Sequence, residues 1–365
     1  MSSEKTRVAL LFGGKSAEHD VSILSARSIL EATPRQRFDV TPICVARDGK
    51  FIGPDSSAKV LATGEKSAKG EKGFSFEQWS QKESIDIVFP IIHGTYGEDG
   101  SLQGYLEILG IPYVGSGVTG SAVGMDKWQM KYAFAAAKLP MVEHVPIALA
   151  DWKTDSERIM RTVANALRLP YFVKPANAGS SVGVSKVKSD GDLAVAVNKA
   201  FRFDDKVLVE RGIDAREIEV SVLGNDEPEA SLPGEIVAAA EFYNYEDKYI
   251  DNKSSLVIPA KLPKARIEEI RRLAIEGYKA IGASGFARVD FFLERGTDRL
   301  YLNEINTLPG FTSISMYPKL WEATELRYSK LIERLIDLGL ERAQTRSDRF
   351  EDTMRFFDEV KSITT

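Results

Sequence analysis

The sequence has one cysteine, Cys44, among 365 residues. A single cysteine excludes an internal disulfide and a cysteine-based metal site. No apolar run approaches the roughly 18–20 residues that a membrane span requires. The first apolar run, Val8–Phe12, is too short for the core of a signal peptide. We therefore expect a protein of the reducing cytoplasm with no membrane partner.

An excess of positive charge is also missing. The 48 Lys and Arg residues against 53 Asp and Glu give a formal net charge of −5, which argues against nonspecific nucleic-acid binding. The hydrophobic fraction of 43% and the charged fraction of 28% are ordinary for a globular protein. Because single cores rarely grow past about 250–300 residues, a chain of this length predicts two or three domains.

Two nucleotide-binding fingerprints are incomplete. Gly13–Ser16 resembles the end of a P-loop, but Ala9 stands where that pattern needs glycine. No G-x-G-x-x-G occurs in this turn, which disfavours a dinucleotide-binding oxidoreductase. What remains is a glycine turn that opens a helix, a natural seat for an anion or carboxylate. Glu18 is either a partner for an ammonium group or a solvated first-turn glutamate.

A serine-nucleophile pattern lacks its partners. Gly179–Gly183 spells G-x-S-x-G, the nucleophile elbow of hydrolases, which needs a following helix and a later histidine. The valine-rich Val184–Val187 predicts a strand instead, and the last histidine, His144, precedes Ser181. The segment is therefore predicted to be strand, turn, strand. These residues leave open a phosphate-binding turn, with Lys174 just upstream, or an ordinary hairpin turn.

Hydrophobic periodicity predicts an α/β first domain with parallel strands, in which residues 53–73 form an exposed polar excursion. Its predicted strands are at 7–12, 40–45, 85–92 and 111–114, and its helices at 21–30 and 101–109. The remaining predicted helices are at 126–138, 154–168, 190–202 and 263–281, and the strands at 206–210, 216–223 and 234–240. Hairpins are predicted at 173–187 and 286–305, and the charged tail beyond 341 is expected to be a solvated helix.

The second hairpin, residues 287–307, predicts a polar site. If it turns near Thr297, Asp290 faces Glu304 and residue 288 faces Asn306. Opposed carboxylates repel unless a cation lies between them, and two carboxylates with an amide oxygen suit Mg²⁺. The alternatives are a solvated outer face, or neutralisation of one carboxylate by Arg288 alone.

Other candidates are weaker in isolation. His93 follows an apolar strand, where open α/β sheets bind ligands, but a structural histidine fits equally. Lys127, Lys174 and Lys248 would each usually be surface lysines. Residues 241–255 are polar and aromatic and predict a mobile lid, in which Tyr249 is either an exposed aromatic or a hydroxyl reaching the site.

The ordered set of motifs resembles the ATP-grasp fold, and within it the D-alanine–D-alanine ligase family, over roughly residues 7–340. The motifs are GGKSAEHDVS, HGTYGEDGSLQG, MDK, VKPANAGSSVGVSKV, VERGIDAREIEV, EFYNYEDKY, ARVDFF and NEINTLPGFTSISMYP. The resemblance implies three domains: a substrate-binding α/β domain at 1–124, a small central domain at 125–216, and a C-terminal domain at 217–365 that carries the metal site and the lid at 241–255. ATP would lie between the sheets of the second and third.

The resemblance also implies residue roles. For ATP these are Lys127, Lys174, Ser180, Ser181, Glu210, Arg211, Ile213, Glu217, Phe242 and Lys248. For two Mg²⁺ ions, with Mn²⁺ as a substitute, they are Asp290, Glu304 and Asn306. For the two substrates they are Glu18, His93, Arg288, Gly310, Ser315 and Met316, and the residues implied in catalysis are Glu18, Ser180, Tyr249 and Arg288. Family members often have lysine where Arg211 stands, which puts that adenine contact in doubt.

The implied reaction joins two D-alanines through an acyl phosphate at the expense of ATP, for peptidoglycan synthesis, in a homodimeric cytoplasmic enzyme. A tyrosine at position 249 goes in this family with an amine as the attacking group, rather than D-lactate. Another ATP-grasp ligase, such as a carboxylase, should lack the EFYNYEDKY segment. A noncatalytic nucleotide-binding regulator should have lost Arg288 or an acidic metal ligand.

Overall fold

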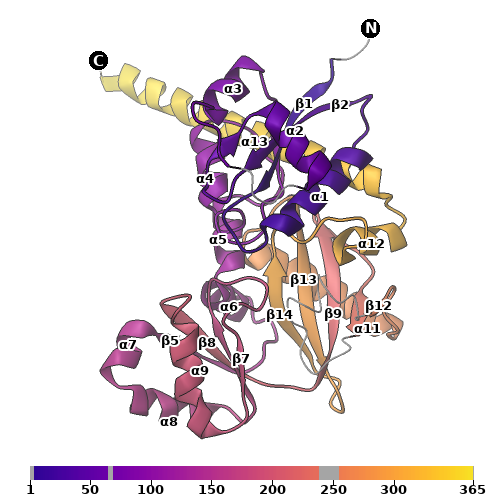
Figure 1. Ribbon diagram of the computed structural model, residues 1–365. Coiled ribbons are helices and arrows are strands. Elements are labelled where there is room, and N and C mark those ends of the chain that lie inside the picture. Colours follow the sequence, from indigo (N-terminus) through magenta and orange to yellow (C-terminus); the bar gives the residue numbers. More distant parts are fainter. Residues whose placement is uncertain (1–3, 65–68, 238–254, 365) are drawn as a thin grey trace.

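Three β-sheets organise the chain (Figure 1). The computed structural model describes residues 4–64, 69–237 and 255–364. In Figure 1 the central and C-terminal sheets lie side by side beneath the N-terminal unit. Over the described ranges, no helix is both long and apolar enough to cross a membrane.

The N-terminal sheet has the strand order β3-β2-β1-β4, with β1 parallel to both β2 and β4 and with β3 antiparallel at the edge. Its strands are β1 Thr6–Gly13, β2 Phe38–Val45, β3 Phe51–Ile52 and β4 Ile87–Pro90. Its helices are α1 His19–Ala32, α2 Pro54–Thr63, α3 Phe76–Lys82, α4 Ser101–Ile108 and α5 Val118–Met125. The predicted parallel α/β domain is confirmed. Of the predicted strand at 111–114, only a parallel bridge between Tyr113 and Val88 is present.

Both faces of this sheet are covered, because alternate β1 residues point to opposite sides. Leu10 and its alternating neighbours pack with α1, α2 and the C-terminal helix α13 (Tyr328–Thr364). Ala9 and Leu11 pack on the other side, with α3 and α4. The last segment of the chain therefore completes the core of the first domain, as Figure 1 shows where α13 crosses the N-terminal unit.

The predicted excursion at 53–73 is wrong over its first half, which is α2. Pro54 occupies the first turn, where its missing N–H costs nothing, and Gly64 ends the helix in the left-handed conformation. Val60 and Leu61 are buried in the domain core. Ser57 is buried too, since its hydroxyl donates to Ile52 O and accepts from Cys44 N. The polar composition concealed a helix with one buried edge.

The central sheet is antiparallel throughout, in the order β5-β8-β6-β7. Its strands are β5 His144–Ala148, β6 Tyr171–Pro175, β7 Ser185–Val187 and β8 Lys206–Arg211. Its helices are α7 Leu149–Thr154, α8 Ser156–Ala166, the 3₁₀ helix η1 Asp190–Asp192, and α9 Leu193–Ala200. Val173 and Val209 pack against the helices, so their neighbours Lys174 and Glu210 face the other way.

The C-terminal sheet has the order β12-β11-β9-β13-β14, with β10 paired to β9. Its strands are β9 Ala215–Leu223, β10 Glu229–Ala230, β11 Gly234–Val237, β12 Ser255–Val257, β13 Phe286–Glu294 and β14 Leu300–Asn306. The helices here are α6 Lys127–Ala136, α11 Lys264–Ala280 and α12 Met316–Ala323. Apolar residues of β9, β13 and β14 pack on α11 and α6, which leaves their alternate polar residues on the opposite face. The domain boundaries stay a prediction.

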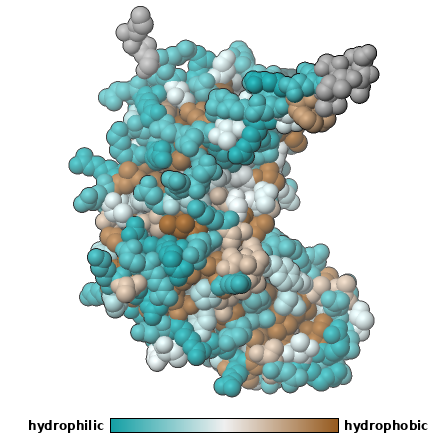
Figure 2. All heavy atoms as spheres, turned by 180° about the vertical axis from the view of Figure 1, so that it is seen from behind, coloured by the Kyte–Doolittle hydropathy of each residue, from teal (hydrophilic) through white to brown (hydrophobic). Residues whose placement is uncertain are grey.

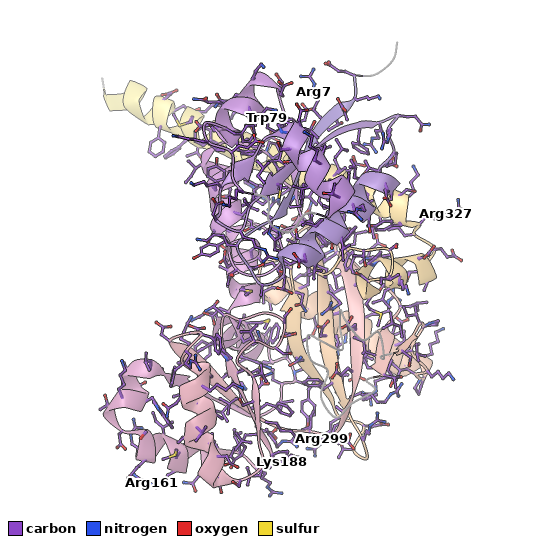
Figure 3. All side chains as sticks on the ribbon, in the orientation of Figure 1. Arg7, Trp79, Arg161, Lys188, Arg299 and Arg327 are labelled. Carbon is purple, nitrogen blue, oxygen red and sulfur yellow. The ribbon has the colours of Figure 1, made fainter. Side chains whose placement is uncertain are left out.

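The surface agrees with the composition. Figure 2, which shows the molecule from behind, is mostly hydrophilic, with scattered hydrophobic groups and a notch between its upper and lower parts. Figure 3 places Lys188, after β7, and Arg299, at the turn of the β13–β14 hairpin, on the lower edges of the two sheets. The tail beyond 341 is an exposed helix, as predicted.

Candidate active site

One cavity of about 1140 Å³ gathers the predicted site residues. From the N-terminal and central units it is lined by Glu18, His93, Lys127, Lys174, Ser180, Ser181, Glu210, Arg211 and Ile213. From the C-terminal unit it is lined by Glu217, Arg288, Asp290, Glu304, Asn306, Gly310, Ser315 and Met316. Phe242, Lys248 and Tyr249, with most of the predicted lid, lie outside the described residues.

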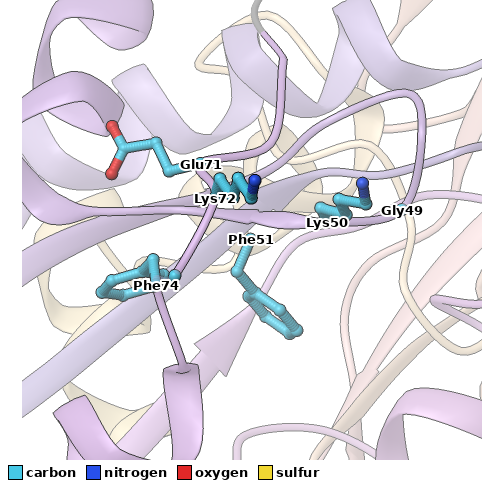
Figure 4. Close-up of a pocket in the computed structure, with 7 residues that line it drawn as sticks. Gly49, Lys50, Phe51, Glu71, Lys72 and Phe74 are labelled. Carbon is cyan, nitrogen blue, oxygen red and sulfur yellow. The ribbon is translucent and has the colours of Figure 1, made fainter.

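A smaller hollow of about 440 Å³ lies in the N-terminal domain. It is lined by Gly49–Phe51 and Glu71–Phe74, and Figure 4 shows these side chains. None of the predicted site residues lines it.

The Gly/Ser turn joins β6 to β7, so the predicted strand–turn–strand is confirmed and the nucleophile elbow is excluded. Ser180 and Ser181 adopt φ values of 49° and 59°, and Gly183 one of 74°. Such left-handed residues leave backbone N–H groups turned outward, as in anion-binding nests. The Ser180 hydroxyl donates to Glu18 Oε1 at 2.5 Å. The turn therefore lies directly against the N-terminal domain.

Two lysines, one on α6 and one on β6, flank the buried carboxylate of Glu210. Lys131 Nζ lies 3.0 Å from Glu210 Oε1, and Lys174 forms an ion pair with the other oxygen. Burial alone raises the pKa of Glu210, but the two ammonium groups outweigh burial and hold that pKa below its usual range. Lys131 is a residue that the sequence reasoning missed. The sequence feature that could have identified Lys131 is its four-residue spacing from Lys127 on α6, which places both lysines on one helix face.

The β13–β14 hairpin has the predicted register, since Arg288 pairs with Asn306 and Asp290 with Glu304. Asp290 also pairs with Glu219 on β9, so three carboxylates form a row across adjacent strands. Sequence reasoning missed Glu219. The sequence feature that could have identified it is the alternation of side chains along β9, which places Glu219 on the same face of the strand as Glu217.

Arg288 contacts two of these three carboxylates. Its Nε and Nη2 atoms each lie 2.7 Å from an oxygen of Asp290, and Nε lies 3.1 Å from Glu219 Oε2. Burial lowers the pKa of Arg288, but Asp290 and Glu219 outweigh burial and hold it well above its usual value. A guanidinium that forms two parallel bonds to one carboxylate stays charged, and its orientation is fixed.

The predicted metal ligands suit a hard cation. Asp290 and Glu304 are opposed on neighbouring strands, and Asn306 Nδ2 donates to Asp290 Oδ2 at 3.0 Å. Among the described residues, no three His, Cys, Asp or Glu side chains are gathered for one ion. The donor set is two carboxylates and an amide, which fits Mg²⁺ when phosphate oxygens and water supply the other ligands. Arg288 donates two hydrogen bonds to Asp290 in this arrangement, so Asp290 can bind a metal ion only if these bonds lengthen or break.

Glu98 also lines the cavity, and its carboxyl group is largely buried. Gly94 N donates to its Oε1 at 2.7 Å, and its side chain is 14% exposed. Burial, together with the nearby charge of Glu18, raises the pKa of Glu98 to about 8.

We expect Glu98→Gln to remove a pH-dependent component of stability. The carboxyl ionises near 4.5 in the unfolded chain but near 8 in the folded one. Between these values unfolding releases a proton, so Glu98 destabilises the fold as pH rises, by up to about 1.4 kcal/mol per pH unit. The variant should therefore gain stability over the parent with increasing pH, as urea unfolding at pH 5, 6, 7 and 8 would measure.

The exposed Glu83→Gln in the same domain is the matched control and should show no such trend. A stability difference between Glu98→Gln and the parent that stays constant over the pH range would contradict the raised pKa.

The second-substrate segment follows β14. Ser315 precedes α12, and its hydroxyl accepts from Thr312 N at 3.1 Å. Met316 is the first residue of that helix. The N–H groups in the first turn of a helix have no partner within the helix and favour a carboxylate, which suits the role that the resemblance gives to these residues.

Lys174 of the small antiparallel sheet and Lys127 of α6 thus line the same cavity as the carboxylates of the larger sheet. This arrangement defines a ligase of the ATP-grasp class. Family models described as "D-ala D-ala ligase N-terminus" and "D-ala D-ala ligase C-terminus" match residues 7–116 and 133–337. The chain belongs to the D-alanine–D-alanine ligase family.

Individual relatives of this family are similar to the chain over nearly its whole length. A D-alanine–D-alanine ligase of Halothermothrix orenii is 48% identical over 92% of this chain and 99% of its own. One from Geobacillus thermodenitrificans is 46% identical over 93% and 97%. The solved ligase from Coxiella burnetii has a TM-score of 0.81 at 34% identity, covering 99% of both chains. VanG D-Ala:D-Ser ligase from Enterococcus faecalis has a TM-score of 0.79 at 32% identity, covering 92% of this chain and 100% of its own.

Proposed function

We propose that the protein joins two D-alanines into D-alanyl-D-alanine with the cleavage of ATP to ADP and phosphate, for peptidoglycan precursor synthesis. The observation that carries this proposal is the convergence of Lys127, Lys174 and the Ser180 turn with Arg288 and the carboxylate row on one cavity. Membership of the D-alanine–D-alanine ligase family supports it.

In this proposal ATP lies between the central and C-terminal sheets. Lys127 and Lys174 contact its phosphates, and the Ser180–Ser181 turn covers them. Lys127 Nζ, which donates to Ala178 O at 2.8 Å, already ties α6 to the start of that turn. Glu210, Arg211 and Ile213 surround adenine. Glu217 binds ribose, and Phe242 and Lys248 complete the nucleotide site.

Asp290, Glu304 and Asn306 would hold two divalent cations, which we propose to be Mg²⁺, with Mn²⁺ able to substitute. Bound there, these cations would neutralise charge on the transferring phosphoryl group. The protein's own residues bind, orient and shield. Positioning and charge stabilisation account for most catalysis of phosphoryl transfer.

The reaction has two displacements. A carboxylate oxygen of the first D-alanine, held at Glu18, attacks the γ-phosphorus of ATP, and ADP leaves with the electron pair of the broken P–O bond. The ammonium group of the second D-alanine, placed by Ser315 and Met316, releases a proton to solvent, and the resulting amine attacks the acyl carbon to form the C–N bond and releases a second proton to solvent. Arg288 and the Gly310 amide stabilise the tetrahedral oxyanion, which expels phosphate. No bond to the enzyme forms.

The identity of the second substrate is the finer part of the proposal. We assign it as D-alanine on the basis of Tyr249, whose hydroxyl would reach Ser180 and, through it, Glu18. The Ser180–Glu18 hydrogen bond supports that chain of contacts. The alternatives are D-lactate and D-serine, the latter being the second amino acid in the name of the VanG ligase.

Phosphate release from ATP tests the proposal. The rate should rise with D-alanine and not with L-alanine, and mass spectrometry should detect the dipeptide. Mixtures of D-alanine with D-serine or D-lactate should still give mainly D-alanyl-D-alanine at pH 7. Phosphate release that ignores D-alanine would refute the assignment, and a predominant mixed product would refute only the second substrate.

Arg211 should govern nucleotide affinity by joining the two sheets. Its Nε donates to Glu143 Oε2 at 2.7 Å, and its Nη1 donates to Glu294 Oε1 at 3.0 Å. Lysine has no fork and cannot hold both carboxylates in this geometry. We expect Arg211→Lys to raise the KM for ATP about three- to tenfold, which matches the net contribution of roughly one ordinary hydrogen bond, and to change kcat little.

Arg295→Lys on the same hairpin is the control, because its ion pair with Asp214 is exposed. Equal KM values for ATP in the two variants would show that Arg211 does not shape the nucleotide site.

We also propose a cytoplasmic homodimer. Sedimentation of the purified protein at micromolar concentration would decide the oligomeric state.

A further inference from the structure

The polar atoms of His93 are both engaged by protein groups. The imidazole is 3% exposed. Its Nδ1 lies 2.9 Å from Leu308 O, and its Nε2 lies 3.1 Å from the hydroxyl of Ser25. A carbonyl only accepts, so Nδ1 carries the proton and Nε2 accepts from Ser25. Burial lowers the pKa of His93, which favours this neutral form.

Ser25 makes a second contact with the same segment. It lies on α1, is fully buried, and accepts from Phe311 N at 3.4 Å. Leu308 and Phe311 are therefore both held by the N-terminal domain, one through His93 and one through Ser25. Between them lies Gly310, which lines the cavity.

The other side of the segment is also fixed. Tyr328 on α13 donates its hydroxyl to Phe311 O at 2.6 Å. A Cβ on Gly310 would lie 3.2 Å from Ser315 Oγ, so the segment is packed closely against the residue that precedes α12. Residues 308–311 are thus held by contacts from four segments: α1, the loop after β4, α13 and the residue before α12.

We propose that Ser25 and His93 act as a pair of positioning residues that fix the backbone of residues 308–311, and with it the Gly310 amide, beside Arg288. This inference rests on the proposed function, in which that amide stabilises the oxyanion. It gives His93 a different task from the predicted contact with the first D-alanine, because the protein occupies both ring nitrogens. It also adds Ser25, which no motif singled out.

A positioning role predicts a loss in turnover rather than in nucleotide affinity. An oxyanion donor acts only when it is held near the developing charge, and removing one such donor costs about 10²–10³ in kcat. Loosening the donor without removing it should cost less. We expect Ser25→Ala to lower kcat about 10- to 100-fold, with the KM for ATP unchanged.

Ser22→Ala is the matched control. Ser22 lies three residues earlier on α1, is equally buried, and also makes two hydrogen bonds, from Gly13 N and to Ile91 O. Neither bond involves residues 308–311. A purely structural loss should therefore appear in both variants, whereas a loss of kcat confined to Ser25→Ala supports the proposal.

His93→Asn removes the same hydrogen bond from its other side, since asparagine can keep a donor near Leu308 O but has no counterpart of Nε2. If both single variants act by losing the bond between Ser25 and Nε2, the kcat of the Ser25→Ala, His93→Asn double variant should fall by less than the product of the two single decreases. This variant also serves if Ser25→Ala does not fold.

Nitrogen-15 NMR of labelled histidine tests the contacts independently of turnover. The parent should show His93 as the neutral Nδ1–H tautomer, and Ser25→Ala should shift the Nε2 resonance. A protonated ring or an Nε2–H tautomer would overturn the proposal. So would equal kcat in Ser25→Ala and Ser22→Ala, or a change only in the KM for ATP. If the parent does not release phosphate in response to D-alanine, the proposed function fails, and the NMR result still decides the contacts.

Discussion

Replacing Arg288 with lysine is expected to lower kcat for D-alanine-dependent ATP cleavage by about 100-fold or more, as for the loss of one oxyanion donor. The guanidinium donates two parallel bonds to Asp290, and its Nε also approaches Glu219. The planar guanidinium contacts both carboxylates and also lines the cavity. Lysine keeps the charge but loses this planar set of donors. The loss should fall on kcat, with the KM for ATP changed little.

Arg216→Lys provides a control of the same chemistry. Arg216 also forms a fork on one carboxylate, with bonds of 2.9 and 2.7 Å to Glu235, in the same sheet. It does not line the cavity. Both variants should lose similar stability in urea, while only Arg288→Lys loses turnover. Comparable kcat values in the two variants, or an effect restricted to ATP affinity, would contradict the assigned role.

Glu304→Gln should abolish most of the metal-dependent turnover while leaving the protein folded. Glu304 faces Asp290 across the hairpin, and Lys127 Nζ lies 3.9 Å from Glu304 Oε2. Losing one anionic ligand weakens the metal site, and metal stabilisation of a transferring phosphoryl group is worth several kcal/mol, or roughly 10²–10³ in rate. The same change relieves repulsion between opposed carboxylates.

Thermal melting with and without Mg²⁺ and ATP separates these effects. Without metal the variant should melt at the parent's temperature or above it, and the stabilisation by Mg²⁺ with ATP should shrink. Glu229→Gln, an exposed position on β10 of the same sheet, should behave as the parent. Normal turnover of Glu304→Gln at ordinary Mg²⁺ would remove Glu304 from the metal site.

The features that the sequence predicted best are local. The register of the β13–β14 hairpin follows from a two-residue period and one turn, so Asp290 and Glu304 face each other as expected. The turn at Ser181 was separated from a nucleophile elbow by the strand that follows it. In both cases the residues that decide the outcome lie close together along the chain.

The features that sequence reasoning missed depend on contacts between distant segments. Lys131 is informative only beside Glu210, and Ser25 only beside His93 and Phe311. Period and propensity do not report such pairs, because each partner alone resembles an ordinary core or surface residue. The helix α2 was missed for a related reason: its buried edge is narrow, and its composition is that of a loop.

Oxygen transfer from substrate to phosphate tests the central claim most directly. D-alanine labelled with ¹⁸O in its carboxyl group would be supplied with unlabelled ATP, and the released phosphate analysed by mass spectrometry. If the carboxylate attacks the γ-phosphorus and the amine then expels phosphate, each phosphate formed must carry one oxygen from the first D-alanine. Phosphate that contains no ¹⁸O, formed alongside the dipeptide, would contradict an acyl phosphate and the reaction proposed for this cavity.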